Sequence, residues 1–126
     1  PLAAASIVAT LDAMESEGIV ENARRIGDEA IGPMLARLAD RFDVIGEVRG
    51  LGVFWALDLV SDRETRAPLP AADVAALKSG LVSRGLLPFV AENRIHVVPP
   101  CVVTDDEVAA AEQIYTDAFA AFADAR

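Results

Sequence analysis

The sequence contains few of the residues that carry metal, thiol or amine chemistry. Its 126 residues include one cysteine (Cys101), one histidine (His96) and one lysine (Lys78). A single cysteine excludes an internal disulfide, and two N/S side chains are too few for a familiar zinc site, which needs three or four ligands. The sequence therefore predicts no metal site, and the lone cysteine is consistent with a reducing, cytoplasmic location.

Basic charge is also scarce. Eleven Lys and Arg residues stand against 20 Asp and Glu residues, for a formal net charge of -9. Binding to nucleic acid or to an anionic membrane surface needs clustered cations, and the chain shows no such cluster. No apolar run approaches the roughly 18–20 residues that a membrane span requires. We therefore expect neither nucleic acid nor membrane among the partners.

Linkers, internal repeats and low-complexity tracts are also lacking, so residues 1–126 are expected to form one domain. The composition is 53% hydrophobic and 25% charged, which is typical of a globular core. The chain begins with Pro1, has no positively charged leader and enters a helical pattern directly. These features favour the interpretation that the chain is a piece of a longer protein.

Hydrophobic periodicity predicts an α+β domain, with a small three-stranded antiparallel sheet packed against about four helices. Helices are expected over 2–17, about 20–40, 71–84 and from 104 toward the chain end. The second helix has its apolar stripe at Ile31, Leu35, Leu38 and Phe42. Because proline removes one helical hydrogen bond and crowds the preceding turn, Pro33 predicts a kink near residues 32–33 or two abutting helices.

The predicted strands cover 44–48, 53–59 and 95–98. The first two form a hairpin across the Gly50–Gly52 region, with the large aromatic residues Phe54 and Trp55 expected in the core. Residues 61–70 are polar and contain proline, which predicts a loop, and residues 85–90 predict only a short extended piece.

The third strand meets a strong stop signal. Pro99 and Pro100 cannot donate to a sheet ladder, and each disfavours helical geometry in the residue before it. A helix start follows at once: Thr104 with Glu107 three residues later predicts a capping box. The turn is therefore anchored by a well-defined helix N-terminus.

Few side chains are candidates for chemistry. Strand alternation places His96 on the face opposite Ile95 and Val97, where it is either a sheet-face histidine with a satisfied hydrogen bond or a ligand contact. Cys101 is more often a small packed hydrophobe than a nucleophile paired with His96. We expect Lys78 to face solvent.

Three segments, in order, resemble the C-terminal part of class III (ω-amino acid type) pyridoxal-phosphate aminotransferases. PLAAASIVATLDAMESEGIVENARRIG is similar to the long helix that often begins with "HPLA". VIGEVRGLGVFWALDLV resembles the "V-G-x-V-R-G-x-G-L" hairpin. RGLLPFVAENRIHVVPPCVVTDDEV resembles the "N-x-I-x-x-x-P-P-L-x-I-T-x-E-E" ending.

The resemblance implies the small domain of a fold type I enzyme that uses pyridoxal 5'-phosphate (PLP) and forms a homodimer. His96 stands where members that bind an α-carboxylate often have an arginine, so His96 is the candidate substrate contact. Phe89 stands where members that use pyruvate have another arginine. The family's Schiff-base lysine, its pyridine-binding aspartate and its phosphate-binding threonine all belong upstream, and Lys78 lies in the wrong context to replace that lysine.

The whole enzyme is therefore expected to transfer an amino group from an ω-amino acid or amine to a 2-oxo acid. These 126 residues, without the large domain that carries the cofactor, are expected to bind no PLP and to be inactive. Two alternatives stay open: a non-enzymatic ligand-sensing or dimerisation module, and a thiol enzyme that uses Cys101 and His96.

Overall fold

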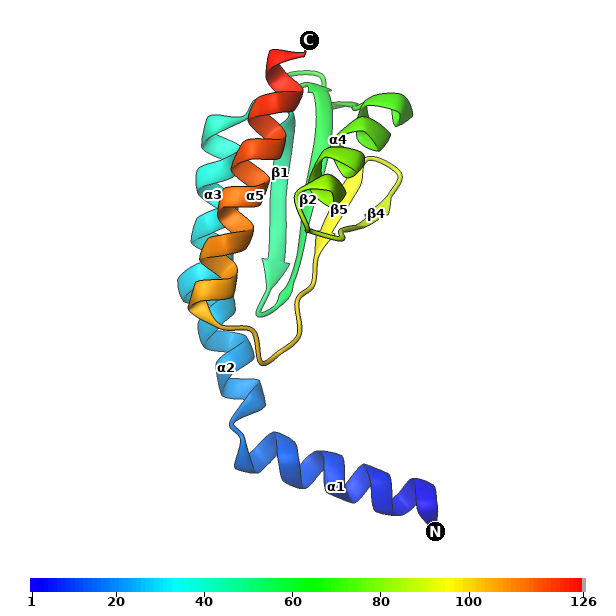
Figure 1. Cartoon of the computed structure of the whole chain (residues 1–126), viewed down its shortest axis with the longest axis vertical. Coiled ribbons are helices and arrows are strands. Elements are labelled where there is room, and N and C mark those ends of the chain that lie inside the picture. The colour runs from blue at the N-terminus through cyan, green and yellow to red at the C-terminus, as the bar shows by residue number, and fades with distance from the viewer. Residues whose placement is uncertain (126) are drawn as a thin grey trace.

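A computed structural model describes residues 1–125 and shows helices packed on a single sheet (Figure 1). The elements in chain order are α1 (Leu2–Ser16), α2 (Ile19–Ile26), a π-helical turn η1 (Gly27–Ile31), α3 (Gly32–Arg41), β1 (Ile45–Leu51), β2 (Phe54–Asp62), β3 (Ala67–Pro68), α4 (Ala71–Ser83), β4 (Phe89–Ala91), β5 (Arg94–Val97) and α5 (Asp105–Asp124). The predicted α+β class and the four predicted helical regions are confirmed.

The sheet has five strands, two more than predicted. Strands lie in the order β1-β2-β5-β4, all antiparallel, and β3 pairs with β2 beyond this path. The hairpin β1–β2 is confirmed. The prediction of a loop over 61–70 was wrong at both ends, because β2 continues to Asp62 and a turn returns Ala67 to pair with it. The Asp62 carboxylate accepts a hydrogen bond from the Thr65 backbone N–H at 2.7 Å, which stabilises this turn.

Helices α3, α4 and α5 lie together on one face of the sheet (Figure 1). The predicted stripe on the second helix is buried there, and Phe42 stacks on the fully buried Phe119 of α5 at 5.4 Å between ring centroids. The strand residues that point into this core include Ile45, Leu57, Leu59, Ile95 and Val97. On α4 the buried residues are Val74, Leu77 and Leu81, whereas Val82 is 46% exposed.

A kink or two abutting helices were predicted at residues 32–33; the structure instead has a π-helical turn just before these residues. Pro33 lies in the first turn of α3, and the widened π-helical turn η1 precedes it. Proline cannot donate a helical hydrogen bond, and the wider turn takes up this defect while the chain stays helical. Gly27, at the start of η1, touches the hairpin turn: a Cβ atom there would lie 2.0 Å from the Gly52 carbonyl oxygen. The absence of a side chain at Gly27 lets the two backbones meet.

The capping box of α5 is confirmed. The Thr104 hydroxyl accepts a hydrogen bond from the Glu107 backbone N–H at 3.3 Å, and the Glu107 carboxylate accepts one from the Thr104 backbone N–H at 2.9 Å. Val108, one residue further on, is buried. The box sets the point at which the chain leaves the Pro99–Pro100 turn.

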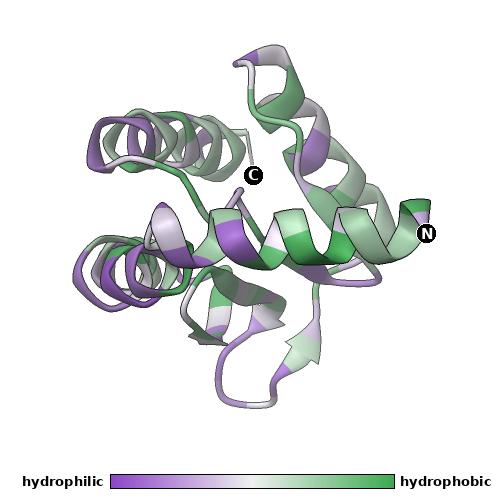
Figure 2. Cartoon of the chain, turned by 90° about the horizontal axis from the view of Figure 1, so that it is seen from below, coloured by the Kyte–Doolittle hydropathy of each residue, from purple (hydrophilic) through white to green (hydrophobic). Residues whose placement is uncertain are grey.

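Helix α1 projects from the end of the domain and buries none of its residues (Figure 2). Its large apolar side chains are therefore open to solvent: Leu2, Ile7, Val8 and Leu11. No helix within the described residues is long and apolar enough to cross a bilayer.

Candidate functional site

The face of the sheet opposite α3, α4 and α5 is here called the open face, because no helix of residues 1–125 covers it (Figure 1). Strand alternation brings His96 to this face while its neighbours Ile95 and Val97 point into the core. The predicted orientation of His96 is confirmed. Because β5 pairs with both β2 and β4, His96 lies beside Ala56 on one side and Phe89 on the other.

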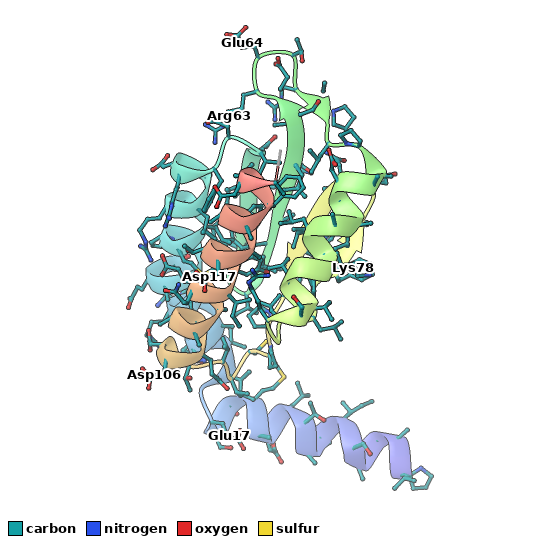
Figure 3. All side chains as sticks on the ribbon, turned by 45° about the horizontal axis from the view of Figure 1, so that its top comes forward. Glu17, Arg63, Glu64, Lys78, Asp106 and Asp117 are labelled. Carbon is teal, nitrogen blue, oxygen red and sulfur yellow. The ribbon has the colours of Figure 1, made fainter. Side chains whose placement is uncertain are left out.

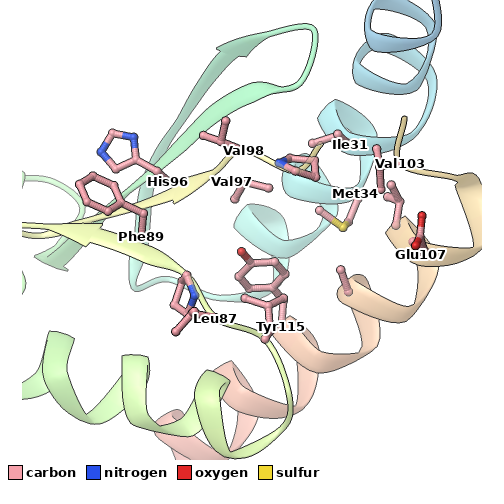
Figure 4. A pocket seen from close by; sticks show the side chains of 15 residues that line it. Ile31, Met34, Leu87, Phe89, His96, Val97, Val98, Val103, Glu107 and Tyr115 are labelled. Atoms are coloured by element: carbon pink, nitrogen blue, oxygen red, sulfur yellow. The ribbon is translucent and has the colours of Figure 1, made fainter. Parts of the chain in front are cut away.

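Aromatic rings flank the half-buried His96. The Phe89 ring lies 5.2 Å from the imidazole centroid, and the Phe54 ring lies 6.2 Å away in an edge-on arrangement. Figure 4 shows Phe89 and His96 side by side. Phe54 is 61% exposed and Phe89 68% exposed, so the prediction that Phe54 belongs to the core was wrong. The two phenylalanine rings form an exposed apolar patch around one polar imidazole, which can take part in hydrogen bonds.

Charged residues of both signs occupy the other half of the open face. The Arg49 guanidinium lies 2.8 Å from the Asp58 carboxylate and 3.9 Å from Glu47. Arg94 lies 2.9 Å from Glu92 and 4.0 Å from Asp58. Each arginine therefore has carboxylate partners, and Asp58, with an 18% exposed side chain, joins the two. A cavity of about 250 Å³ separates this network from the aromatic patch.

A second cavity, of about 290 Å³, opens where β5 runs into the Pro99–Pro100 turn. It lies between α3, α5 and the segment 86–89, and its lining is largely apolar (Figure 4). Tyr115 of α5 lines it and is only 2% exposed. Burial raises the pKa of the Tyr115 hydroxyl well above its ordinary value, so that group stays protonated at neutral pH.

Cys101 and His96 are not brought together. Cys101 is exposed, and within residues 1–125 no hydrogen bond joins its thiol to the imidazole. Its backbone carbonyl instead accepts a hydrogen bond from the Asn22 side chain at 2.8 Å, which ties the turn to α2. The geometry therefore gives no support to a thiol enzyme, and the expectation that Cys101 is packed was wrong.

Lys78 is exposed on α4 (Figure 3). It is not among the residues that line the five cavities described in residues 1–125. Nor does any group of three or more His, Cys, Asp or Glu side chains in that range gather as a metal site would require. Lys78 therefore lacks the buried surroundings that activate a lysine for covalent work.

Two features of the site could not be predicted from the sequence: the aromatic neighbours of His96 and the cavity beside Tyr115. Phe54 is 42 positions away from His96 in the sequence, and only strand pairing brings the two rings together. Tyr115 is buried on α5, but no local sequence pattern reveals a cavity beside its hydroxyl.

The structure is thus an α+β domain with helices on one face of an antiparallel sheet and a half-buried histidine on the other. The sequence model described as "Aminotransferase class-III" matches residues 1–119. The chain belongs to the class III aminotransferase family.

Individual relatives agree with this assignment. Taurine–pyruvate aminotransferase of Rhodobacter capsulatus is 39% identical over 83 residues, which are 66% of this chain and 18% of that protein. Mitochondrial ornithine aminotransferase of Oryza sativa is 34% identical over 119 residues, 93% of this chain and 24% of that protein.

Among solved structures, a PLP-bound amine transaminase from an uncultivated Pseudomonas species is 36% identical, with a TM-score of 0.84 over 90% of this chain and 26% of that one. A transaminase with L-alanine gives a TM-score of 0.91 at 26% identity, over 99% of this chain and 30% of that one. The chain thus spans less than a third of the length of each of these relatives.

Proposed function

We propose that residues 1–126 are the C-terminal small domain of a PLP-dependent class III aminotransferase, which acts as a homodimer in the cytoplasm. The whole enzyme transfers an amino group from an ω-amino acid or an amine to a 2-oxo acid. The observation that carries the proposal is the family match over residues 1–119 in a chain that spans 18% to 24% of two relatives. That share corresponds to one domain of a much longer enzyme.

The residues described here do not by themselves fit the cofactor. PLP chemistry needs an amine nucleophile held beside the cofactor and an acidic partner for its pyridine nitrogen. Lys78 is the chain's only lysine, and it is exposed on α4. We therefore assign the reactive lysine to the remainder of the polypeptide and derive no catalytic step within residues 1–126.

In this proposal, the role of the small domain is to contact the substrate through the open face. His96 supports this role best, because it is half-buried between two exposed phenylalanine rings. An imidazole offers a carboxylate at most one hydrogen bond at a time, whereas arginine offers a bidentate pair. The nearby Arg49 and Arg94 already have carboxylate partners. Donors with an apolar or aryl group at this position therefore suit the patch better than donors with a carboxylate.

The test compares the full-length protein with residues 1–126 in a transamination assay with amine and amino acid donors and pyruvate as acceptor. We expect PLP absorbance and turnover only in the full-length protein. His96→Arg should lower KM for a carboxylate-bearing donor by about tenfold, because a charge-assisted hydrogen bond contributes roughly 1.5–3 kcal/mol. Lys78→Arg, on the exposed side of α4, is the control and should change nothing.

Two results would contradict the proposal. Cofactor binding and turnover by residues 1–126 alone would show that the reactive centre lies in this chain. A full-length protein that has no lysine-bearing large domain would favour the non-enzymatic alternative, a dimerisation or ligand-sensing module. The exposed apolar residues of α1 are the observation that supports this alternative.

A further inference from the structure

One long edge of the sheet has no neighbouring strand. β1 is the first strand in the order β1-β2-β5-β4, so within residues 1–125 no strand pairs with its outer side (Figure 1). It is seven residues long and contains neither proline nor lysine, the residues that commonly block such an edge. An edge strand of this length offers a row of backbone N–H and C=O groups to another strand.

The hairpin turn determines which backbone groups of β1 point outward. Leu51 and Phe54 pair with each other and close a turn of two residues. Only every second residue of an antiparallel strand forms backbone hydrogen bonds with a given neighbour, and Leu51 forms them with β2. The backbone N–H and C=O groups of Gly50 and Val48 are therefore turned toward the free side.

A groove of about 460 Å³ runs between this free edge and α3. Ala36 and Ala39 line it on the helix side, and their short side chains leave room beside the strand. The groove ends at Arg63, whose guanidinium donates a hydrogen bond to the Ile45 carbonyl at 2.9 Å. A register irregularity in the β1–β2 pairing lies at the same end, so the free edge comprises residues 46–51.

The sequence of this edge is complementary to itself. Residues 46–50 read GEVRG. In an antiparallel pair centred on Val48, Glu47 lies opposite the partner's Arg49, and each glycine lies opposite a glycine. Opposed residues of an antiparallel pair lie on the same face, so two ion pairs form across the joint. Val48, whose backbone groups point outward, exchanges two backbone hydrogen bonds with the partner's Val48.

The charges also distinguish this register from its neighbours. The side chains of Glu47 and Arg49 lie on the open face and are 37% and 51% exposed, so both are accessible to a second strand. A register centred on Glu47 would oppose two carboxylates, and one centred on Arg49 would oppose two guanidinium groups. Like charges directly opposite each other are destabilising. The register centred on Val48 is therefore the favoured one.

We propose that β1 is a contact surface for a second copy of this protein, which pairs with it in antiparallel direction about a two-fold axis at Val48. The two sheets then form one continuous sheet, with both α3 helices on the same face. A two-fold contact requires a self-complementary surface, which the edge provides, and this identifies the partner as an identical chain. The inference goes beyond the proposed function, which includes a homodimer but names no surface between its copies, and it does not depend on the activity.

Disulfide trapping in the full-length protein tests this pairing without reference to activity. The exposed Cys101 is first replaced by serine, and Val48→Cys is then compared with Ala75→Cys, a control at an exposed position of α4. Opposed residues of an antiparallel pair have Cα atoms about 4.5–5.5 Å apart, within the range that a disulfide spans. Under mild oxidation we expect about tenfold more covalent dimer from Val48→Cys, with a peptide map that joins the two copies at position 48.

Mixed samples test the register. Glu47→Cys protein mixed with Arg49→Cys protein should form a disulfide between positions 47 and 49 of different copies. Each variant alone should give severalfold less, because its two cysteines lie diagonally, roughly 7–8 Å apart, at or beyond the reach of a disulfide. If circular dichroism shows that Val48→Cys is unfolded, this mixture replaces it as the test of the contact.

Three results would overturn the proposal. Equal dimer yields from Val48→Cys and Ala75→Cys would show that the copies meet by random collision. A disulfide from position 48 to a cysteine of the same chain would show that another part of the polypeptide occupies the edge. Equal yields from the mixture and from its separate components would exclude the pairing centred on Val48.

Discussion

Two glycines in helical segments give a sharp test of the packing described above, because the same substitution should act in opposite directions. Gly80 lies inside α4, and a Cβ atom there would meet nothing closer than the Arg84 side chain at 3.6 Å. Gly27 lies in the π-helical turn, where a Cβ atom would be 2.0 Å from the Gly52 carbonyl oxygen and 2.4 Å from its carbon. Both atoms of this second contact belong to backbone and cannot rotate away.

The magnitudes follow from these distances. Alanine is more favourable than glycine in a helix interior by about 0.8–1.0 kcal/mol, so Gly80→Ala should raise the free energy of unfolding by roughly 0.5–1 kcal/mol. Overpacking costs about 1–3 kcal/mol, and more where backbone must move. After the helix preference is subtracted, Gly27→Ala should lower the free energy of unfolding by up to about 2 kcal/mol, and by more if the backbone must move.

Urea denaturation at low protein concentration measures both variants. Trp55 is the only tryptophan, and its indole N–H donates to the Gly52 carbonyl at 2.6 Å, so its fluorescence reports directly on the contact with Gly27. Far-UV circular dichroism follows the helices independently. If Gly27→Ala shifts the urea midpoint upward together with Gly80→Ala, the close approach of η1 and the hairpin turn is not the packing of this protein.

Three further outcomes are expected. Thr104→Ala should lower the free energy of unfolding by about 1 kcal/mol in urea titrations, and Thr104→Ser should restore most of it, because the capping hydroxyl is kept; equal losses would exclude the cap. Glu112 accepts hydrogen bonds from Arg37 at 2.8 Å, which holds the pKa of that carboxyl below its ordinary value. Since the native pKa is the lower one, this stabilisation is complete above the unfolded-state pKa and is lost as pH falls through the native pKa. In an NMR titration Arg37→Gln should move the Glu112 pKa upward, and no movement would contradict the ion pair. In sedimentation velocity the 126-residue chain should self-associate as concentration rises, and Ile7→Gln with Leu11→Gln on exposed α1 should reduce this; a monomer at every concentration would refute it.

Long periodic segments of this fold could be predicted from sequence, and short pairings could not. The stripe of Ile31, Leu35 and Leu38 is readable because one helix face meets the sheet over several turns. Strands β3 and β4 have two and three residues, too few for alternation to show, and each depends on an edge offered by another strand. For Phe54, alternation predicted the strand, while its size wrongly suggested the core face.

Of the candidate site, the sequence pointed to only one residue. His96 was identified by resemblance and its orientation by alternation, since both depend on local sequence. The cluster with Phe54 and Phe89 depends on the register of three strands, which is a property of the whole sheet. The cavity beside Tyr115 likewise depends on how separate segments of the chain pack together.

Helix α1 has one more consequence, which concerns its own persistence in water. Isolated helices of about 15 residues are marginal in solution, and α1 has 15 residues with no buried side chain to hold it. Asp12 and Glu15 lie toward its C-terminal end, where negative charge opposes the helix dipole, and its last turn has no basic residue. The backbone amide protons of α1 should therefore exchange rapidly with solvent as long as no other protein surface covers the helix. Slow exchange in α1 would then indicate that the rest of the enzyme has packed against it.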